Sequence, residues 1–257
     1  MGNHDASSGS RPASNSLQDQ HMFWENHVDF TARALDQLRF SPPVAHVYNP
    51  LVYARAPILQ YFERYAGAAR EILFLGMNPG PFGMVQTGIP FGEIRRVREY
   101  LRIDAPVLAP VHVHPKRPVL GFDCPRSEVS GRRLWSWVEG RYPDASAFFQ
   151  RHFVANYCPL AFMEAGGKNL TPDKLNAAEA AELFRICDRA LVELVRRLEV
   201  RWVIGVGQFA ARRAELALAG LPVRIDSIAH PSPANPAANR GWDALVDAKL
   251  ASLGLLQ

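Results

Sequence analysis

The chain has 257 residues, which is enough for one large or two small domains with a buried core. Its composition, 48% hydrophobic and 21% charged, excludes bulk disorder, and its three scattered cysteines exclude a disulfide framework and a four-cysteine iron–sulfur cluster. The formal net charge of +4 permits an anionic partner without requiring one.

The first 20 residues are mostly polar and lack the apolar segment of a signal peptide. We expect a flexible tail over residues 1–20 and a single domain over residues 21–257. No apolar run approaches the roughly 20 residues that a membrane span needs, so we expect no membrane association.

The rest of the chain alternates predicted helices and strands. Helices are expected over residues 50–70, 176–198, 208–219 and 242–253, and short apolar runs predict strands over 71–76, 153–157, 201–206 and 223–229. Strands separated by helices of this length are mostly parallel and covered on both faces. The sequence therefore predicts an α/β fold, a three-layer α/β/α sandwich around a central, mostly parallel four-stranded sheet.

Polar residues follow the ends of these strands. In such sheets, ligands bind beyond the carboxyl ends of the strands. There the sequence places Asn78, Asn156 and His230. Two amides and an imidazole can recognise a planar heterocycle that has both donor and acceptor groups. This arrangement predicts a polar, uncharged ligand.

Residues 90–133 contain nine basic and five acidic side chains, a difference that equals the whole net charge. Such a segment can neutralise several phosphates, although a solvated helical face explains the run from Arg95 to Arg98 equally well. Nucleic acid is therefore one of the partners that the charge distribution allows.

Two long motifs resemble one known family. Residues 76–92 (GMNPGPFGMVQTGIPFG) resemble the first motif of the single-strand-selective monofunctional uracil-DNA glycosylases, and residues 230–242 (HPSPANPAANRGW) resemble the second. Residues 114–121, 127–131 and 156–160 also resemble the family, so the similarity extends over about residues 45 to 250. The resemblance implies a uracil-DNA glycosylase-like fold and hydrolysis of the bond between deoxyribose and uracil, or an oxidised relative such as 5-hydroxymethyluracil, at the start of base excision repair.

The resemblance also implies site residues. Asn78 would hold the attacking water and His230 would face the departing base oxygen. Phe91 would stack on the flipped base and Asn156 would bind its polar edge. The backbone from Gly80 to Met84, which includes Phe82 and Gly83, would line the pocket near C5 of the base, and Met77 would also bind the substrate.

DNA contacts are implied mainly for the loop that follows His230. Its implied contact residues are Pro231, Ser232, Pro233, Ala234, Asn235 and Arg240, together with Lys116, Arg117 and Ser130 elsewhere. Animal members carry arginine at the position of Ala234, so duplex penetration would depend on another residue, for which Arg240 is the candidate. Three prolines stiffen the loop.

The expected partner is uracil-containing DNA, single- or double-stranded, and we expect a monomer without cofactor or metal. His112 and His114 have metal-like spacing, but no further ligand is evident. The 25 arginines against 4 lysines suggest a GC-rich genome, which favours a bacterial, cytoplasmic protein; a eukaryotic one would be nuclear.

The residue types themselves predict a mechanism. An amide is a poor general base, so Asn78 can position water but can hardly deprotonate it early. The glycosidic bond would break first, and the main task would be to stabilise the departing uracil anion, with His230 as donor in a neutral or a cationic form.

Other interpretations remain open. Each polar residue could serve its own backbone, and Phe91 could be core packing. We assign Trp135 and Trp137 to packing and Cys158 to a buried thiol beside the pocket. Gly205-x-Gly207-x-x-Ala210, followed by Asp226, resembles a dinucleotide fingerprint. A non-catalytic module that binds damaged or single-stranded DNA would fit the basic segment and the stiff loop equally well.

Overall fold

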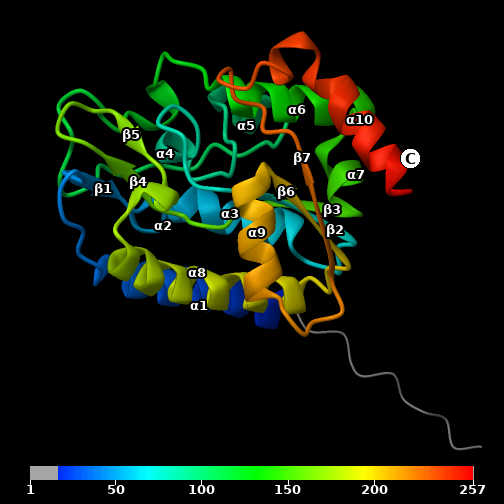
Figure 1. Cartoon of the computed structure of the whole chain (residues 1–257), viewed down its shortest axis with the longest axis horizontal. Coiled ribbons are helices and arrows are strands. Elements are labelled where there is room, and N and C mark those ends of the chain that lie inside the picture. The colour runs from blue at the N-terminus through cyan, green and yellow to red at the C-terminus, as the bar shows by residue number, and fades with distance from the viewer. Residues whose placement is uncertain (1–16, 257) are drawn as a thin grey trace, which may run out of the picture.

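The structure, a computed structural model, describes residues 17–256 and is built on a four-stranded parallel sheet (Figure 1). Its strands are β2 (Ile72–Gly76), β3 (His152–Asn156), β6 (Trp202–Val206) and β7 (Arg224–Ile228), in the order β3-β2-β6-β7. All three pairings are parallel. The predicted strands are confirmed to within one or two residues, because short apolar runs bounded by turn residues are typical of buried parallel strands.

Helices cover both faces of this sheet, as predicted (Figure 1). One face carries α1 (Leu17–Asp36), α3 (Arg55–Tyr65), α8 (Ala177–Arg197) and α9 (Gln208–Ala217), and the other carries α6 (Val129–Arg141), α7 (Ala145–Phe149) and α10 (Trp242–Ser252). Alternation along β3 follows these layers. His152 stacks on Phe148 of α7, whereas Phe153 packs against Phe62 of α3.

The helix predicted over residues 50–70 is two helices. α2 (Pro50–Tyr53) ends at Ala54, and α3 then runs only to Tyr65. The carbonyl of Tyr53 would accept the helical hydrogen bond from residue 57, but Pro57 has no N–H. The N–H of Leu108 donates to that carbonyl instead, at 2.8 Å.

Two long helices, α1 and α6, and several short elements were not predicted. A small antiparallel sheet joins β1 (His46–Tyr48), β4 (Ala161–Met163) and β5 (Asn169–Leu170), and α4 (Met84–Thr87) and α5 (Ile94–Glu99) are single short helices. Strands of two or three residues are too short to show periodicity.

The predicted tail over residues 1–20 lies mostly outside the described residues, but residues 17–20 are the first turn of α1. Among the residues that the structure describes, no helix is long and apolar enough to cross a membrane.

Backbone hydrogen bonds extend the strand pairing into the loops at the carboxyl edge. Tyr157 and Cys158 donate to the carbonyls of Gly76 and Met77, both at 2.9 Å, so the loop after β3 is held against the loop after β2. Gly207 donates to the carbonyl of Ile228 at the end of β7, also at 2.9 Å. The loops after all four strands therefore start from fixed positions.

Gly205 is a packing glycine in β6. A Cβ there would lie 2.5 Å from the backbone nitrogen of Ala211 in α9. We expect Gly205→Ala to lower the free energy of unfolding by about 1–3 kcal/mol, because α9 must move off the sheet. Urea denaturation measures this.

Gly140→Ala in α6 is the matched control, because a Cβ there meets nothing within 4 Å. This control should raise the free energy of unfolding by about 0.5–1 kcal/mol. Equal effects from the two substitutions would contradict the packing role of Gly205.

Candidate active site

A pocket of about 590 Å³ opens at the carboxyl edge of the sheet and brings Asn78, Asn156 and His230 together. Seven other residues that the sequence indicated also line it: Met77, Gly80, Phe82, Phe91, Ser130, Ser232 and Pro233. Gly83 and Met84 do not line this pocket. Gly83 lies against Glu128, and Met84 contacts Asn156.

Gly76 lets two lining side chains approach the end of β2. A Cβ at this position would lie 2.6 Å from Cε2 and 2.7 Å from Cζ of Phe91, and it would overlap Oδ1 of Asn156. The Phe91 ring and the Asn156 amide therefore meet over bare backbone. Any larger residue at this position would push both side chains into the pocket.

Phe91 has an unusual backbone conformation, with φ at 53°. Such a value is strained for a bulky residue and persists only where the surroundings impose it. The Trp135 indole N–H donates to the Phe91 carbonyl at 3.1 Å, and Gly131 leaves room for that carbonyl. Trp135 is core packing, as predicted, but it also fixes the backbone that directs the Phe91 ring.

The Asn78 amide uses its nitrogen for a hydrogen bond within the protein. Nδ2 donates to the carbonyl of Leu160 at 3.3 Å. Oδ1 accepts no hydrogen bond from the described residues, which leaves this atom as an acceptor for a ligand or water in the pocket. An amide held in this way can accept a hydrogen bond from water but has no basic group to take its proton.

The surroundings of His230 answer the question of its charge that the sequence left open. The backbone N–H of Ser232 donates to Nδ1 at 3.1 Å, so Nδ1 is an acceptor and the ring proton belongs on Nε2. Burial lowers the pKa of His230 as well. The ring is therefore a neutral imidazole at neutral pH, with Nε2–H as its hydrogen-bond donor.

Glu128 is a pocket residue to which the sequence analysis assigned no role. Its Oε2 is buried and has no hydrogen-bond partner in the described part of the chain, and a Cβ at Gly80 or at Gly83 would collide with the carboxyl group. Burial raises its pKa to about 7, against the opposing effect of the Phe82 and Gly83 backbone N–H groups. Neither glycine can be enlarged without moving this buried acid.

The loop after His230 is held together by its own side chains. Asn235 donates to the carbonyl of His230 at 3.0 Å and accepts from the N–H of Ala237 at 3.1 Å, so this residue faces into the loop. Pro231 is buried, whereas Pro233, Ala234 and Arg240 are exposed.

Arg133, to which the sequence assigned no role, also fixes this loop. Its guanidinium donates to the carbonyl of Pro231 and to Oδ1 of Asn239, both at 2.9 Å.

The basic segment divides into two parts. Arg95, Arg96 and Arg98 form ion pairs with Glu99, Glu139 and Asp104, as expected of a solvated helical face.

Other basic residues of the segment lie near the pocket. The guanidinium of Arg126 lies 3.9 Å from the centroid of the Phe82 ring, and that of Arg117 lies 5.5 Å away. Lys116 is exposed. These cations flank a residue that lines the pocket.

The metal-like spacing of His112 and His114 has another explanation, because His114 is held by its own surroundings. His114 is buried, accepts at Nδ1 from the N–H of Lys116, and has Nε2 3.2 Å from the carbonyl of Glu164. Over the residues that the structure describes, no group of three or more His, Cys, Asp or Glu side chains could hold a metal.

Packing also explains the two glycines of the dinucleotide-like pattern Gly205-x-Gly207-x-x-Ala210. Gly205 packs on α9, and Gly207 lies beneath the His230 ring. Asp226 lies within β7 and forms an ion pair with Lys249 at 2.9 Å. A ribose-binding carboxylate would have to be free at the end of its strand.

The chain is similar to known proteins over most of its length. A model of the uracil DNA glycosylase superfamily matches residues 63–248. A Mus musculus protein named single-strand selective monofunctional uracil DNA glycosylase is 49% identical over 236 residues, which cover 91% of this chain and 84% of the relative. A Bos taurus protein of that name is 48% identical over 224 residues, which cover 86% and 82% of the two chains.

A solved structure gives a second, structural similarity. The crystal structure of wild-type Pedobacter heparinus SMUG2 superposes with a TM-score of 0.64 at 16% identity, covering 89% of this chain and 97% of that one. At this identity the likeness concerns the fold. The relatives in sequence are mammalian and so do not favour the bacterial source that the arginine content predicts.

The raised pKa of Glu128 predicts a pH-dependent stability. The folded state keeps its proton up to about pH 7, whereas the unfolded state loses it near 4.5. Stability from this group is thus fully present below pH 4.5 and is lost as the pH rises through 7. Between these limits, Glu128→Gln should gain about 3 kcal/mol of unfolding free energy relative to the parent protein.

Urea denaturation of both proteins between pH 4.5 and 8 checks this. Glu215→Gln, which removes an exposed carboxylate of α9, is the control and should leave the pH profile of stability unchanged. A constant difference between Glu128→Gln and the parent protein would mean that the Glu128 carboxyl is not protonated in the folded state.

Proposed function

This chain belongs to the family of single-strand selective monofunctional uracil-DNA glycosylases, and we propose that the pocket at the sheet edge is where it binds a flipped uracil and hydrolyses the bond to deoxyribose. The protein is a DNA glycosylase of base excision repair. The finer assignments below, of residue roles, substrates and DNA forms, are part of the proposal.

The first step is cleavage of the bond between C1′ of the sugar and N1 of uracil. Both electrons of the bond leave with the base, which gives an oxocarbenium-like sugar and a uracil anion. Nε2–H of the neutral His230 donates to the base oxygen on which charge develops. A preorganised donor of this kind in a water-poor site is worth roughly 10² to 10³ in rate.

Water adds in the second step. Oδ1 of Asn78 accepts one hydrogen bond from this water and thereby holds its oxygen towards C1′. After the new C–O bond forms, the water's surplus proton is lost to solvent and the uracil anion takes up a proton in turn, so a neutral amide suffices and no strong base is required. The products are uracil and an abasic site.

Recognition of the base uses the two residues that meet over Gly76. The Asn156 amide offers both an acceptor and a donor, which match N3–H and O4 of uracil. The Phe91 ring provides stacking, worth about 1–3 kcal/mol per base, which offsets part of the cost of flipping. Because the same edge is present in uracils oxidised at C5, such as 5-hydroxymethyluracil, we include them among the substrates.

The DNA is bound by the exposed end of the loop after His230 and by the cations around Phe82. Pro233, Ala234 and Arg240 lie at the exposed part of the loop, and Arg133 and Asn235 hold that part in place. A loop that is already ordered can enter a duplex without a further entropic cost. We therefore propose that the enzyme acts on both single- and double-stranded DNA. We also propose that it acts as a monomer.

The convergence of Asn78, Asn156 and His230 on one pocket is the observation that supports these roles most strongly. A module that only binds DNA would have no need of a water-holding amide opposite a hydrogen-bond donor. The test that separates the two functions is turnover: an oligonucleotide with one uracil, in excess over the protein, should yield more alkali-labile sites than there are protein molecules.

Asn78→Ala should reduce the single-turnover rate on this oligonucleotide by about 10²-fold or more, because the attacking water loses its fixed position. The dissociation constant for the DNA should change by less than about threefold, since no charge is removed. Quenched-flow cleavage and fluorescence anisotropy measure the two quantities. Loss of binding in parallel with turnover would show that Asn78 supports the loop instead.

Ala234→Arg should increase kcat/KM on duplex substrate by about tenfold, because a longer side chain at the exposed end of the loop can fill the space that the flipped base leaves. On single-stranded substrate the gain should stay below about threefold, which is the contribution of one added phosphate contact. Ala237→Arg, in the same loop but partly buried, is the control. Equal gains on both substrates would exclude a wedge at position 234.

A further inference from the structure

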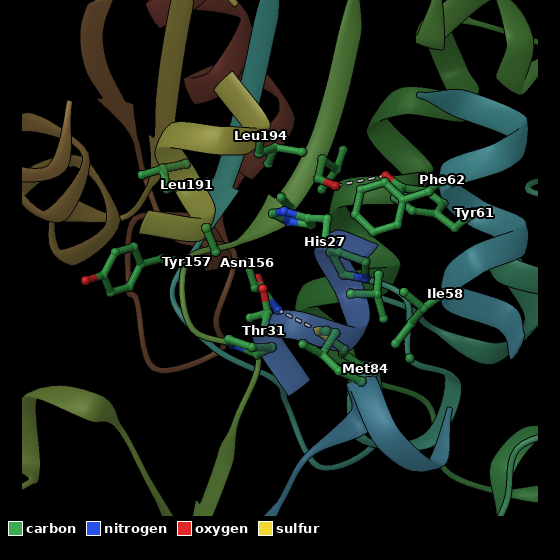
Figure 2. Close-up of a pocket in the computed structure, with 18 of the residues that line it drawn as sticks. His27, Thr31, Ile58, Tyr61, Phe62, Met84, Asn156, Tyr157, Leu191 and Leu194 are labelled. Atoms are coloured by element: carbon green, nitrogen blue, oxygen red, sulfur yellow. Dashed lines mark hydrogen bonds between the residues drawn. The ribbon is translucent and has the colours of Figure 1, made fainter. Parts of the chain in front are cut away.

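A second, inner cavity of about 80 Å³ lies on the other side of Asn156 from the base pocket. It is enclosed by α1, α3, β3 and α8, with Ile58, Phe62, Leu191 and Leu194 among its apolar walls (Figure 2). Asn156 lines both cavities, and Met84 lines only the inner one. The Asn156–Met84 pair is therefore the partition between the two spaces.

This partition is held by one weak interaction. Nδ2 of Asn156 donates to Sδ of Met84 at 3.2 Å, as the dashed line in Figure 2 shows. A thioether is a weak acceptor on a flexible, unbranched side chain. When the carbonyl oxygen of a base takes this donor, the Met84 thioether loses the hydrogen bond that holds it against Asn156.

On the side of Gly76 and Phe91, the wall of the base pocket cannot move outward. Phe91 and Asn156 already touch the backbone at Gly76, and Trp135 fixes the backbone of Phe91. The Gly76 side therefore offers no free space, whereas on the side of Met84 the inner cavity does.

The inner cavity suits a thioether and a methyl group. Its polar neighbour His27 is directed to Glu193, with Nδ1 3.3 Å from Oε2, and the remaining walls are mainly apolar. By the same measure of volume, about 10–15 Å³ is enough to hold one water molecule, so about 80 Å³ leaves room for at least two non-hydrogen atoms. A hydroxymethyl group adds that many atoms to uracil.

We propose that the inner cavity receives the Met84 side chain when a uracil with a substituent at C5 enters the base pocket, so that this cavity sets how large a C5 substituent the enzyme accepts. The inference rests on the proposed function of the base pocket. Uracil itself requires no such movement.

The test fills the inner cavity from a helix that does not touch the base pocket. Leu191→Phe in α8 adds bulk at the cavity wall, and Leu183→Phe, at a buried position of α8 outside the cavity lining, is the matched control. We measure kcat/KM on single-stranded oligonucleotides that carry either uracil or 5-hydroxymethyluracil. Leu191→Phe should lower the ratio of 5-hydroxymethyluracil to uracil excision about tenfold or more, because each excluded carbon discriminates by that order.

Pressurised xenon gives a second measurement on the unaltered protein, because apolar cavities of this kind bind it. Xenon should slow excision of 5-hydroxymethyluracil and leave excision of uracil unchanged. An unchanged substrate ratio in both experiments would overturn the inference, as would a parent protein that excises uracil but not 5-hydroxymethyluracil. Failure to excise uracil at all would instead refute the proposed function.

Discussion

The bare backbone at Gly76 is the constraint on which the base pocket depends. Because no side chain projects from the end of β2, the Asn156 amide and the Phe91 ring can occupy the same small space. Phe91 lies there with φ of 53°, and the Trp135 indole and the gap at Gly131 hold its carbonyl in place. One glycine thus determines how three distant segments of the chain pack.

The buried titratable groups of the pocket, His230 and Glu128, carry little charge at neutral pH, which suits the formation of an anion beside them. His230 is neutral because a backbone N–H occupies Nδ1 and because burial lowers its pKa. Glu128, the buried acid beside Gly80 and Gly83, has a pKa raised to about 7, so much of its negative charge is suppressed at neutral pH. A fixed carboxylate near the departing base would repel it, whereas neutral donors stabilise it without that cost.

Recognition and tolerance are divided between the two sides of the base pocket. The Gly76 side is tightly packed and presents groups that match the polar edge of uracil. Behind Asn156 lie the flexible thioether of Met84 and the inner cavity. A site built in this way can be strict about hydrogen bonding and permissive about size at one ring position.

The four parallel strands, the helices at residues 176–198, 208–219 and 242–253 and the polar residues at the carboxyl edge could be predicted from the sequence, because buried strands, amphipathic helices and turn residues are encoded locally. The sequence did not determine the break at Ala54, where Leu108 takes a carbonyl of α2, or the roles of Glu128 and Arg133. The tautomer of His230 and the inner cavity were also decided only by the tertiary structure. These features arise from contacts between segments far apart in the chain, where packing geometry, not local periodicity, fixes which atoms meet.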